Sequence, residues 1–423
     1  MGHTLTHSDG KGRVTPMTVA RPHLWGSTFD SLYSRGYRWF WYHRLGTEGA
    51  MYLNSVAQGW LVYQLTGSAL ALGWVGSGRA IASLLISPWG GVIGDRMDKR
   101  SLLIMTRVGM GLCTVVIRTL VSLGLVRVWH LALSTLLNGI LSALMMGAQQ
   151  SIVSDLVDDK TVMNAVSMNA VCLGVAGLAF PVLSGYLIEW LGVAGVYYIE
   201  AVMYALAVLA LFQVPRVAPD GHYREPAARA LTAGLGYTAR DAVLSSMIVI
   251  AMARFLLSMG YSTYMPKFAD EVLHYDAAGL GMLLAAPGLG ALLASLTMAS
   301  LRNYAHKGRL LLGTGIGMGA ALMLFGLMRS AAVVFVMLIV LGACGNILRV
   351  INQTILQMGC EARYRGRVMS LYGMTMGTGP LLSVPMGALA DAYGVPIVVA
   401  LQGALLAVVF GAVALFRPAV RRA

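Results

Sequence analysis

The chain has 423 residues, of which 57% are hydrophobic and only 12% are charged, and its formal net charge is +13. A soluble domain is about a quarter charged, so this composition excludes a water-facing globule and favours a protein whose surface lies mostly in lipid. The basic residues stand singly or in short clusters between apolar runs, without a nucleic-acid-binding motif. This distribution argues against a nucleic-acid partner and is typical of membrane topology signals.

The first segment, residues 1–39, is polar and lacks the apolar core of a signal peptide. We expect it to be a cytoplasmic tail. Beyond it, apolar runs long enough to cross a bilayer as helices recur with short polar breaks. The predicted helices lie near 40–65, 69–93, 101–126, 129–153, 163–190, 193–214, 243–266, 277–301, 309–328, 331–357, 367–391 and 395–416.

These ranges predict an all-α integral membrane protein with twelve transmembrane helices. Two six-helix bundles, at 40–214 and 243–416, are separated by a charged central loop at 215–242 and followed by a short tail at 417–423. With both termini and the central loop in the cytoplasm, 23 of the 31 Lys and Arg residues lie inside, three lie outside and five lie within helices. Because basic residues concentrate on the cytoplasmic side of membrane proteins, this orientation is the predicted one.

The two halves also resemble each other in sequence. Lys99–Ile104 reads KRSLLI and Lys307–Leu312, 208 positions later, reads KGRLLL, while Gly192-Val193 recurs 202 positions later as Gly394-Val395. Several matches in register indicate a duplicated six-helix unit. Parallel repeats that enclose a site at the membrane midplane are a pattern of transporters.

The segment Gly91–Arg100, GVIGDRMDKR, resembles the signature loop between helices 2 and 3 of the major facilitator superfamily. Three more segments, Gly59–Val75, Asp155–Asn169 and Arg365–Met374, resemble the branch that holds enterobactin exporters and macrolide efflux proteins. The resemblance covers residues from about 45 to 416. It implies two pseudo-symmetric bundles in a bacterial inner membrane and drug:proton antiport chemistry.

The resemblance also implies a conformational latch at this loop. The residues that match the family pattern are Gly91, Asp95, Arg96, Lys99 and Arg100. A carboxylate at the end of helix 2 could accept hydrogen bonds from a helix N-terminus of the other half, where the helix dipole favours an anion. A contact made in only one conformer would bias the conformational equilibrium. The alternative is that the basic residues only determine topology.

Polar groups within the helices are the candidate substrate contacts, because charge in a bilayer is costly and marks function by default. In the superfamily, helices 1, 4, 7 and 10 line the central cavity. The predicted cavity residues are Asn54, Gln58, Arg79, Asn138, Arg254, Asn346, Arg349 and Gln353. The amides could instead join helices to one another. The internal arginines outnumber the internal carboxylates by two, which favours an anionic substrate.

Coupling to protons needs a group that changes charge, which arginine cannot do. Glu48 and Glu200 are the carboxylates clearly inside the predicted helices, and Asp95 lies at the rim. We expect Glu48 to be the carrier because helix 1 lines the cavity, although it could instead form a local pair with Arg44, four residues earlier. Glu200 lies at the same depth as Arg118, and the two are expected to form a structural pair.

The leading hypothesis is therefore proton-coupled export of a small amphiphilic molecule, of the siderophore or drug type, by alternating access. The chain contains no Walker motif, so ATP is not the expected energy source. The motif typical of exporters in helix 5 is only partial, because Phe180–Gly185, FPVLSG, lacks the glycine before the proline. Proton-coupled or facilitated uptake therefore stays open as an alternative. A transporter-like sensor or assembly scaffold is the alternative of another class. No enzyme activity, cofactor or metal site is predicted, and a monomer is expected to suffice.

Overall fold

The computed structural model describes residues 29–158, 161–216, 227–258, 260–300 and 306–422, and every element in these ranges is a helix. The elements are α1 (Asp30–Tyr33), α2 (Arg35–Thr66), α3 (Ala69–Arg96), α4 (Lys99–Ser122), α5 (Val128–Leu156), α6 (Val162–Leu211), α7 (Ala227–Arg240), α8 (Ala242–Ser258), α9 (Gly260–Thr263), α10 (Met265–Leu273), α11 (Ala277–Ser300), α12 (Lys307–Leu327), α13 (Ala331–Gly359), α14 (Ala362–Met376), η2 (Gly379–Leu382), α15 (Ser383–Tyr393), α16 (Val395–Phe416) and α17 (Pro418–Arg422).

Each predicted apolar range coincides with helix in the described residues, but four ranges deviate from one separate, continuous helix. The fifth and sixth ranges run together in α6, where Gly192 turns the chain with φ 69° and ψ 172°; only glycine adopts such a backbone readily. The seventh range divides into α8, α9 and α10, and the eleventh into α14, η2 and α15. Within the described ranges, eight helices are long and apolar enough to cross a membrane, so the chain is a multi-pass membrane protein.

The charged stretch at 215–242, predicted as a loop, contains helix α7. Tyr237 of α7 stacks on Tyr364 of α14, with ring centroids 4.3 Å apart. The second half of this stretch is therefore attached to the C-terminal helices. The assignment of the whole stretch to the cytoplasm stays a prediction.

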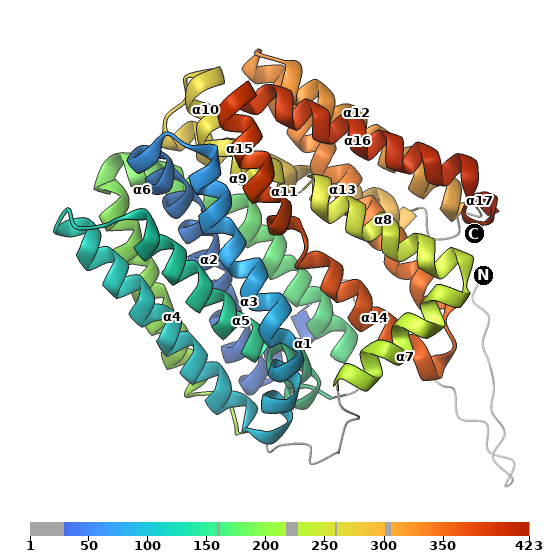
Figure 1. Cartoon of the computed structure of the whole chain (residues 1–423). Helices are drawn as coiled ribbons and strands as arrows, with labels where there is room; N and C mark the ends of the chain where they lie inside the picture. The colour runs from blue at the N-terminus through green and yellow to red at the C-terminus, as the bar shows by residue number, and fades with distance from the viewer. Residues whose placement is uncertain (1–28, 159–160, 217–226, 259, 301–305, 423) are drawn as a thin grey trace, which may run out of the picture.

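The helices form two bundles that lie side by side (Figure 1). In the first, α2 packs on α6 and α3 on α5; in the second, α12 packs on α16 and α11 on α13. Two seams join the bundles, one between α3 and α15 and the other between α6 and α11. Both seams run toward the end of the molecule at which α3 and α11 begin. We call this end the Asp391 face, because Asp391 lies there in the seam between α3 and α15.

The seam between α3 and α15 depends on glycine. A Cβ atom on Gly73 of α3 would collide with the carbonyl oxygen of Ser383, and one on Gly387 of α15 would meet the carbonyl oxygen of Ala69 at 2.6 Å. Small residues of this kind let membrane helices approach backbone to backbone. No larger side chain fits at either position without separating the two helices.

The seam between α6 and α11 repeats the arrangement. A Cβ atom on Gly185 would collide with the carbonyl oxygen of Ala277, and one on Gly281 would collide with that of Pro181. These two glycines stand 202 and 208 positions from their counterparts in the first seam, the same offsets that relate the halves in sequence. The repeat therefore has a structural counterpart in the seams.

A carboxylate closes each seam at the Asp391 face. Asp391 of α15 accepts hydrogen bonds from the Ser68 hydroxyl (2.5 Å) and from the backbone N–H groups of Ala69 (2.8 Å) and Leu70 (3.0 Å), at the start of α3. It also pairs with Lys267 of α10, whose Nζ lies 2.6 Å away. In the other seam, Glu189 of α6 accepts from the N–H of Ala278, at the start of α11, at 3.0 Å.

Candidate functional site

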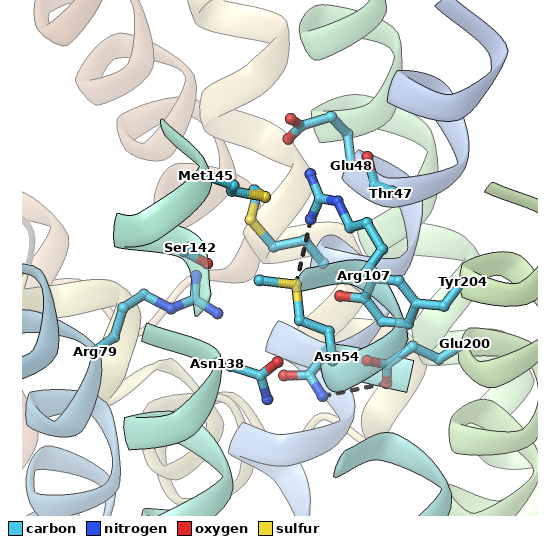
Figure 2. Close-up of a pocket in the computed structure, with 12 residues that line it drawn as sticks. Thr47, Glu48, Asn54, Arg79, Arg107, Asn138, Ser142, Met145, Glu200 and Tyr204 are labelled. Atoms are coloured by element: carbon cyan, nitrogen blue, oxygen red, sulfur yellow. Dashed lines mark hydrogen bonds between the residues drawn. The ribbon is translucent and has the colours of Figure 1, made fainter. Parts of the chain in front are cut away.

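A polar cavity lies inside the N-terminal bundle, among α2, α3, α4, α5 and α6 (Figure 2). Its volume is about 50 Å³, which holds a few waters but not a drug-sized ligand. The residues that line it are Thr47, Glu48, Met51, Asn54, Arg79, Arg107, Met110, Asn138, Ser142, Met145, Glu200 and Tyr204. The cavity thus brings together five of the predicted site residues.

Glu200 is the most enclosed charged group of this cavity. It is 2% exposed, and its carboxylate accepts hydrogen bonds from the Asn54 amide (3.2 Å) and the Thr114 hydroxyl (3.0 Å). Among the described residues, no Lys or Arg forms an ion pair with it. The partners of this buried carboxylate are therefore neutral.

Glu48 has a different environment. Its Oε1 lies 3.0 Å from Nη2 of Arg44, one turn earlier on α2, and both side chains are 11% exposed. The local pair that the sequence left open as an alternative is present. Protonating Glu48 would leave the Arg44 guanidinium buried without its counter-ion, which is strongly unfavourable.

Arg107 of α4 was not among the predicted site residues. It is 5% exposed, donates to the Gln149 side chain at 3.1 Å, and contacts the Met110 sulfur at 3.3 Å. Its buried Nε has no hydrogen-bond partner in the part of the chain that the structure describes. Figure 2 shows its guanidinium on the side of the cavity where Glu48 lies. Its position within an apolar helix was the sequence signal that could have identified it.

The amides of the predicted set divide between cavity and helix contacts. Asn54 and Asn138 line the cavity. Gln58 donates to the Leu131 carbonyl (3.2 Å) and the Thr135 hydroxyl (2.8 Å) of α5, so it joins α2 to α5, as the alternative for the amides proposed.

The expected pair of Arg118 and Glu200 is wrong. The Arg118 guanidinium lies 5.0 Å from the centroid of the Tyr198 ring, and Tyr198 is an exposed residue of α6. Glu200 points into the bundle instead. The two residues were matched by depth, but depth does not determine which face of a helix a residue occupies.

The predicted residues of the C-terminal half lie away from this cavity. Arg254 of α8 is 6% exposed, and its guanidinium lies 4.1 Å from the centroid of the Phe255 ring. Arg349 of α13 donates to Oδ1 of Asn346 at 2.6 Å. Gln353 follows one turn later on α13 and is half-buried. The structure therefore divides the predicted substrate residues between two bundles.

The predicted latch lies at the end of α3 and the start of α4. Gly91, Asp95 and Arg96 are in the last turns of α3, and their side chains are outside the described part of the chain. Lys99 pairs with Asp155 of α5 at 2.8 Å, and Arg100 lies over the Phe212 ring. Both contacts stay within the N-terminal bundle, and the latch itself stays a prediction.

Asp98 is the N-cap of α4. Its carboxylate accepts hydrogen bonds from the backbone N–H and the hydroxyl of Ser101, at 2.9 Å and 2.6 Å. Asp is a preferred N-cap residue, so Asp98 supplies a start signal for this helix.

Sequence reasoning also missed the carboxylates of the seams. Glu189 and Asp391 stand 202 positions apart, like Gly192 and Gly394. Their equivalence in the repeat was the signal that could have identified them.

A family model described as transmembrane secretion effector matches residues 26–423. The staphyloferrin A transporter of Staphylococcus aureus is 24% identical over 350 residues, which are 81% of this chain and 87% of that protein. The enterobactin exporter of Shigella flexneri is 26% identical over 344 residues, which are 79% of this chain and 77% of the exporter.

Solved transporter structures share the fold. A POT family transporter in complex with a thioalcohol-conjugated peptide superposes with a TM-score of 0.73 at 12% identity, covering 93% of this chain and 99% of that chain. A bacterial homologue of the human lysosomal transporter Spinster, in an inward-facing and unoccupied conformation, gives 0.66 at 14% identity, with 95% and 96% covered.

Proposed function

Since the chain belongs to the transmembrane secretion effector family of the major facilitator superfamily, and is thus a secondary transporter and not an enzyme, we propose that it exports a small amphiphilic molecule across a bacterial inner membrane. The relatives named for staphyloferrin A and enterobactin support a substrate of the siderophore type, with drug-like molecules as the broader class. Protons are the proposed energy source, and the two bundles are proposed to rock around the substrate.

One observation carries the coupling: Glu200 is enclosed in a water-sized cavity, and its hydrogen-bond partners are neutral. A proton carrier must be able to exist both charged and neutral. Glu200 can gain a proton without breaking an ion pair of the described residues, whereas protonation of Glu48 would break its pair with Arg44. Glu200 is therefore the better candidate, contrary to the preference for Glu48 that helix position suggested.

The alternating-access part of the proposal is supported by the seams. Glycine crossings and two carboxylate contacts hold the bundles together at the Asp391 face. If the charge distribution gives the orientation correctly, this face is the periplasmic one. The conformation would then be closed toward the periplasm, and export would require these contacts to separate.

The experiment is transport in proteoliposomes under an imposed pH gradient, with enterobactin and staphyloferrin A as substrates. Glu200→Gln should abolish gradient-driven accumulation while preserving exchange of substrate across uncoupled vesicles. Glu48→Gln is the matched control: it should lower the amount of folded protein, yet the protein that survives should still pump.

Gradient-driven pumping by Glu200→Gln at the wild-type rate would exclude Glu200 as the carrier. The sign of the gradient that drives accumulation distinguishes export from uptake. An absence of any substrate flux in the wild-type protein, with every substrate and gradient, would favour the sensor or scaffold.

A further inference from the structure

The interior of the C-terminal half contains positive charge without an internal counter-ion. Every acidic residue between 242 and 416 lies at or near a helix end: Asp270, Glu271, Asp276, Glu361 and Asp391. Arg254 and Arg349, in contrast, lie within α8 and α13. In the N-terminal cavity two carboxylates accompany the two arginines. The two halves therefore differ in charge although they share a fold.

Arg254 and Arg349 belong to one electrostatic cluster. A Cβ atom on Gly345 of α13, one turn before Arg349, would lie 3.8 Å from Nη1 of Arg254, so the Arg254 guanidinium reaches the helix that carries Arg349. The side chain of Tyr372 on α14 interacts electrostatically with both arginines. Arg254 is buried and Arg349 is exposed, so a ligand could reach the pair from the side of Arg349. Neither arginine forms an ion pair with any described residue. A buried guanidinium in this state is unfavourable, and contact with the Phe255 ring offsets only part of the cost.

Asn346 holds Arg349 in place. The Asn346 amide nitrogen donates to the Ala291 carbonyl (3.0 Å) and the Ser295 hydroxyl (2.8 Å) of α11. This leaves its oxygen to accept from Nη2 of Arg349 at 2.6 Å. The orientation of one guanidinium edge is thus determined by a neutral group, and the remaining N–H donors of Arg349 are available to another acceptor.

We propose that Arg254, Arg349 and the Tyr372 hydroxyl form a subsite for an anionic group of the substrate, and that the group is a carboxylate. A guanidinium fork matches the two oxygens of a carboxylate, and the bound anion would supply the charge that the helices of this half lack. Asn346 is a positioning residue for Arg349. The inference deepens the proposed function and rests on it for the identity of the cargo: protons are handled at Glu200 in one half, and substrate charge in the other.

The test measures anion binding to the full chain in nanodiscs of zwitterionic lipid, without a proton gradient. The probe is citrate, a tricarboxylate, and its neutral trimethyl ester is added at the same ionic strength. Citrate should raise the thermal unfolding midpoint of the wild-type protein and the ester should not. Arg254→Gln and Arg349→Gln should each weaken the apparent citrate affinity by about tenfold or more, and Arg349→Lys should keep part of it.

Asn346→Asp provides the sharpest variant, because it places a carboxylate beside Arg349. The change also removes the N–H donors to Ala291 and Ser295, so the response to citrate is the reading that decides: it should be lost, since Arg349 gains an internal counter-ion. A merely structural role for Asn346 would lower the unfolding midpoint and leave the response to citrate in place. Arg118→Gln is the matched control, because Arg118 lies in the N-terminal half, where it contacts the exposed Tyr198 ring. The citrate response of this variant should equal the wild-type response.

An equal citrate response in the double variant Arg254→Gln/Arg349→Gln would overturn the subsite. A citrate response that disappears when anionic lipid replaces part of the zwitterionic lipid, and is lost in the same variants, would assign the cluster to a lipid headgroup instead. Citrate binding at the cluster without gradient-driven transport would contradict the proposed function and leave the subsite standing.

Discussion

Glu189 and Asp391 stand at equivalent positions of the two halves, 202 residues apart, and each carboxylate accepts a hydrogen bond from the first turn of a helix in the opposite half. The N-terminus of a helix carries partial positive charge and unsatisfied N–H groups, so an anion is favoured there. The same bond thus pins both seams at the Asp391 face. This is the kind of contact that the sequence predicted for Asp95 at the opposite end of α3.

The two contacts differ in strength, and this difference predicts unequal effects of mutation. Asp391 has four donors, including Lys267, whereas Glu189 has one in the described residues. Asp391→Asn should therefore open the Asp391 face more than Glu189→Gln, because a hydrogen bond to a charged group contributes about 1.5–3 kcal/mol. Asp276→Asn is the control, since Asp276 caps its own helix at Gly279.

The measurement is a distance distribution between spin labels at Leu125 and Tyr393, which are both exposed, after replacement of the four native cysteines. Asp391→Asn should increase the population of long distances, and Asp276→Asn should not. Equal distributions in wild type and Asp391→Asn would remove Asp391 from the closing contact.

The glycine crossings predict a second way to open this face. Gly73→Ala would place a methyl group against the carbonyl of Ser383, and backbone cannot move aside cheaply, so α3 and α15 should separate. Gly76→Ala, three residues later on α3, meets its nearest neighbour, Thr263, at an ordinary 3.6 Å and should be tolerated. The same pair of labels reports the result. Normal distances and normal transport in Gly73→Ala would show that the seam is not part of the gate.

The charge distribution predicts that both termini and the central stretch are cytoplasmic. Reporter fusions at Gly221 and Ala423, which both lie outside the described residues, should give cytoplasmic signals. A periplasmic signal from either fusion would reverse the topology, and the Asp391 face would then be cytoplasmic.

The predicted latch at the other end of α3 has its own test. Asp95→Asn should leave the protein folded and inserted but strongly reduce transport, and it should shift the conformers toward the cytoplasm-open state. Transport in proteoliposomes and the spin-label distances measure the two effects. Wild-type transport rates in Asp95→Asn would show that the loop only determines membrane topology. Lys99, which pairs with Asp155, would then be one of the residues that hold the loop in place.

The sequence alone determined the helices and the duplication. A run of about 20 apolar residues has few options other than a spanning helix, so each predicted range proved helical. The offsets of 202 and 208 predicted a repeat, and the seam glycines follow the same offsets. Charges within the apolar runs also identified Glu48, Glu200 and Arg254 as candidates, because burial of charge without a purpose is too costly to persist.

Only the tertiary structure decided which of these groups meet. The position of a residue along an apolar run gives its depth in the membrane but does not show which neighbouring helix it faces. The sequence therefore paired Glu200 with Arg118, whereas the hydrogen-bond partners of Glu200 are Asn54 and Thr114. In the sequence, Asp391 is only a carboxylate at the end of a helix. Its contact with the opposite half becomes visible when the fold brings α15 against the start of α3. Contacts between residues more than a hundred positions apart depend on how helices cross, and the crossing is set by backbone approach at a few glycines, which no local pattern encodes.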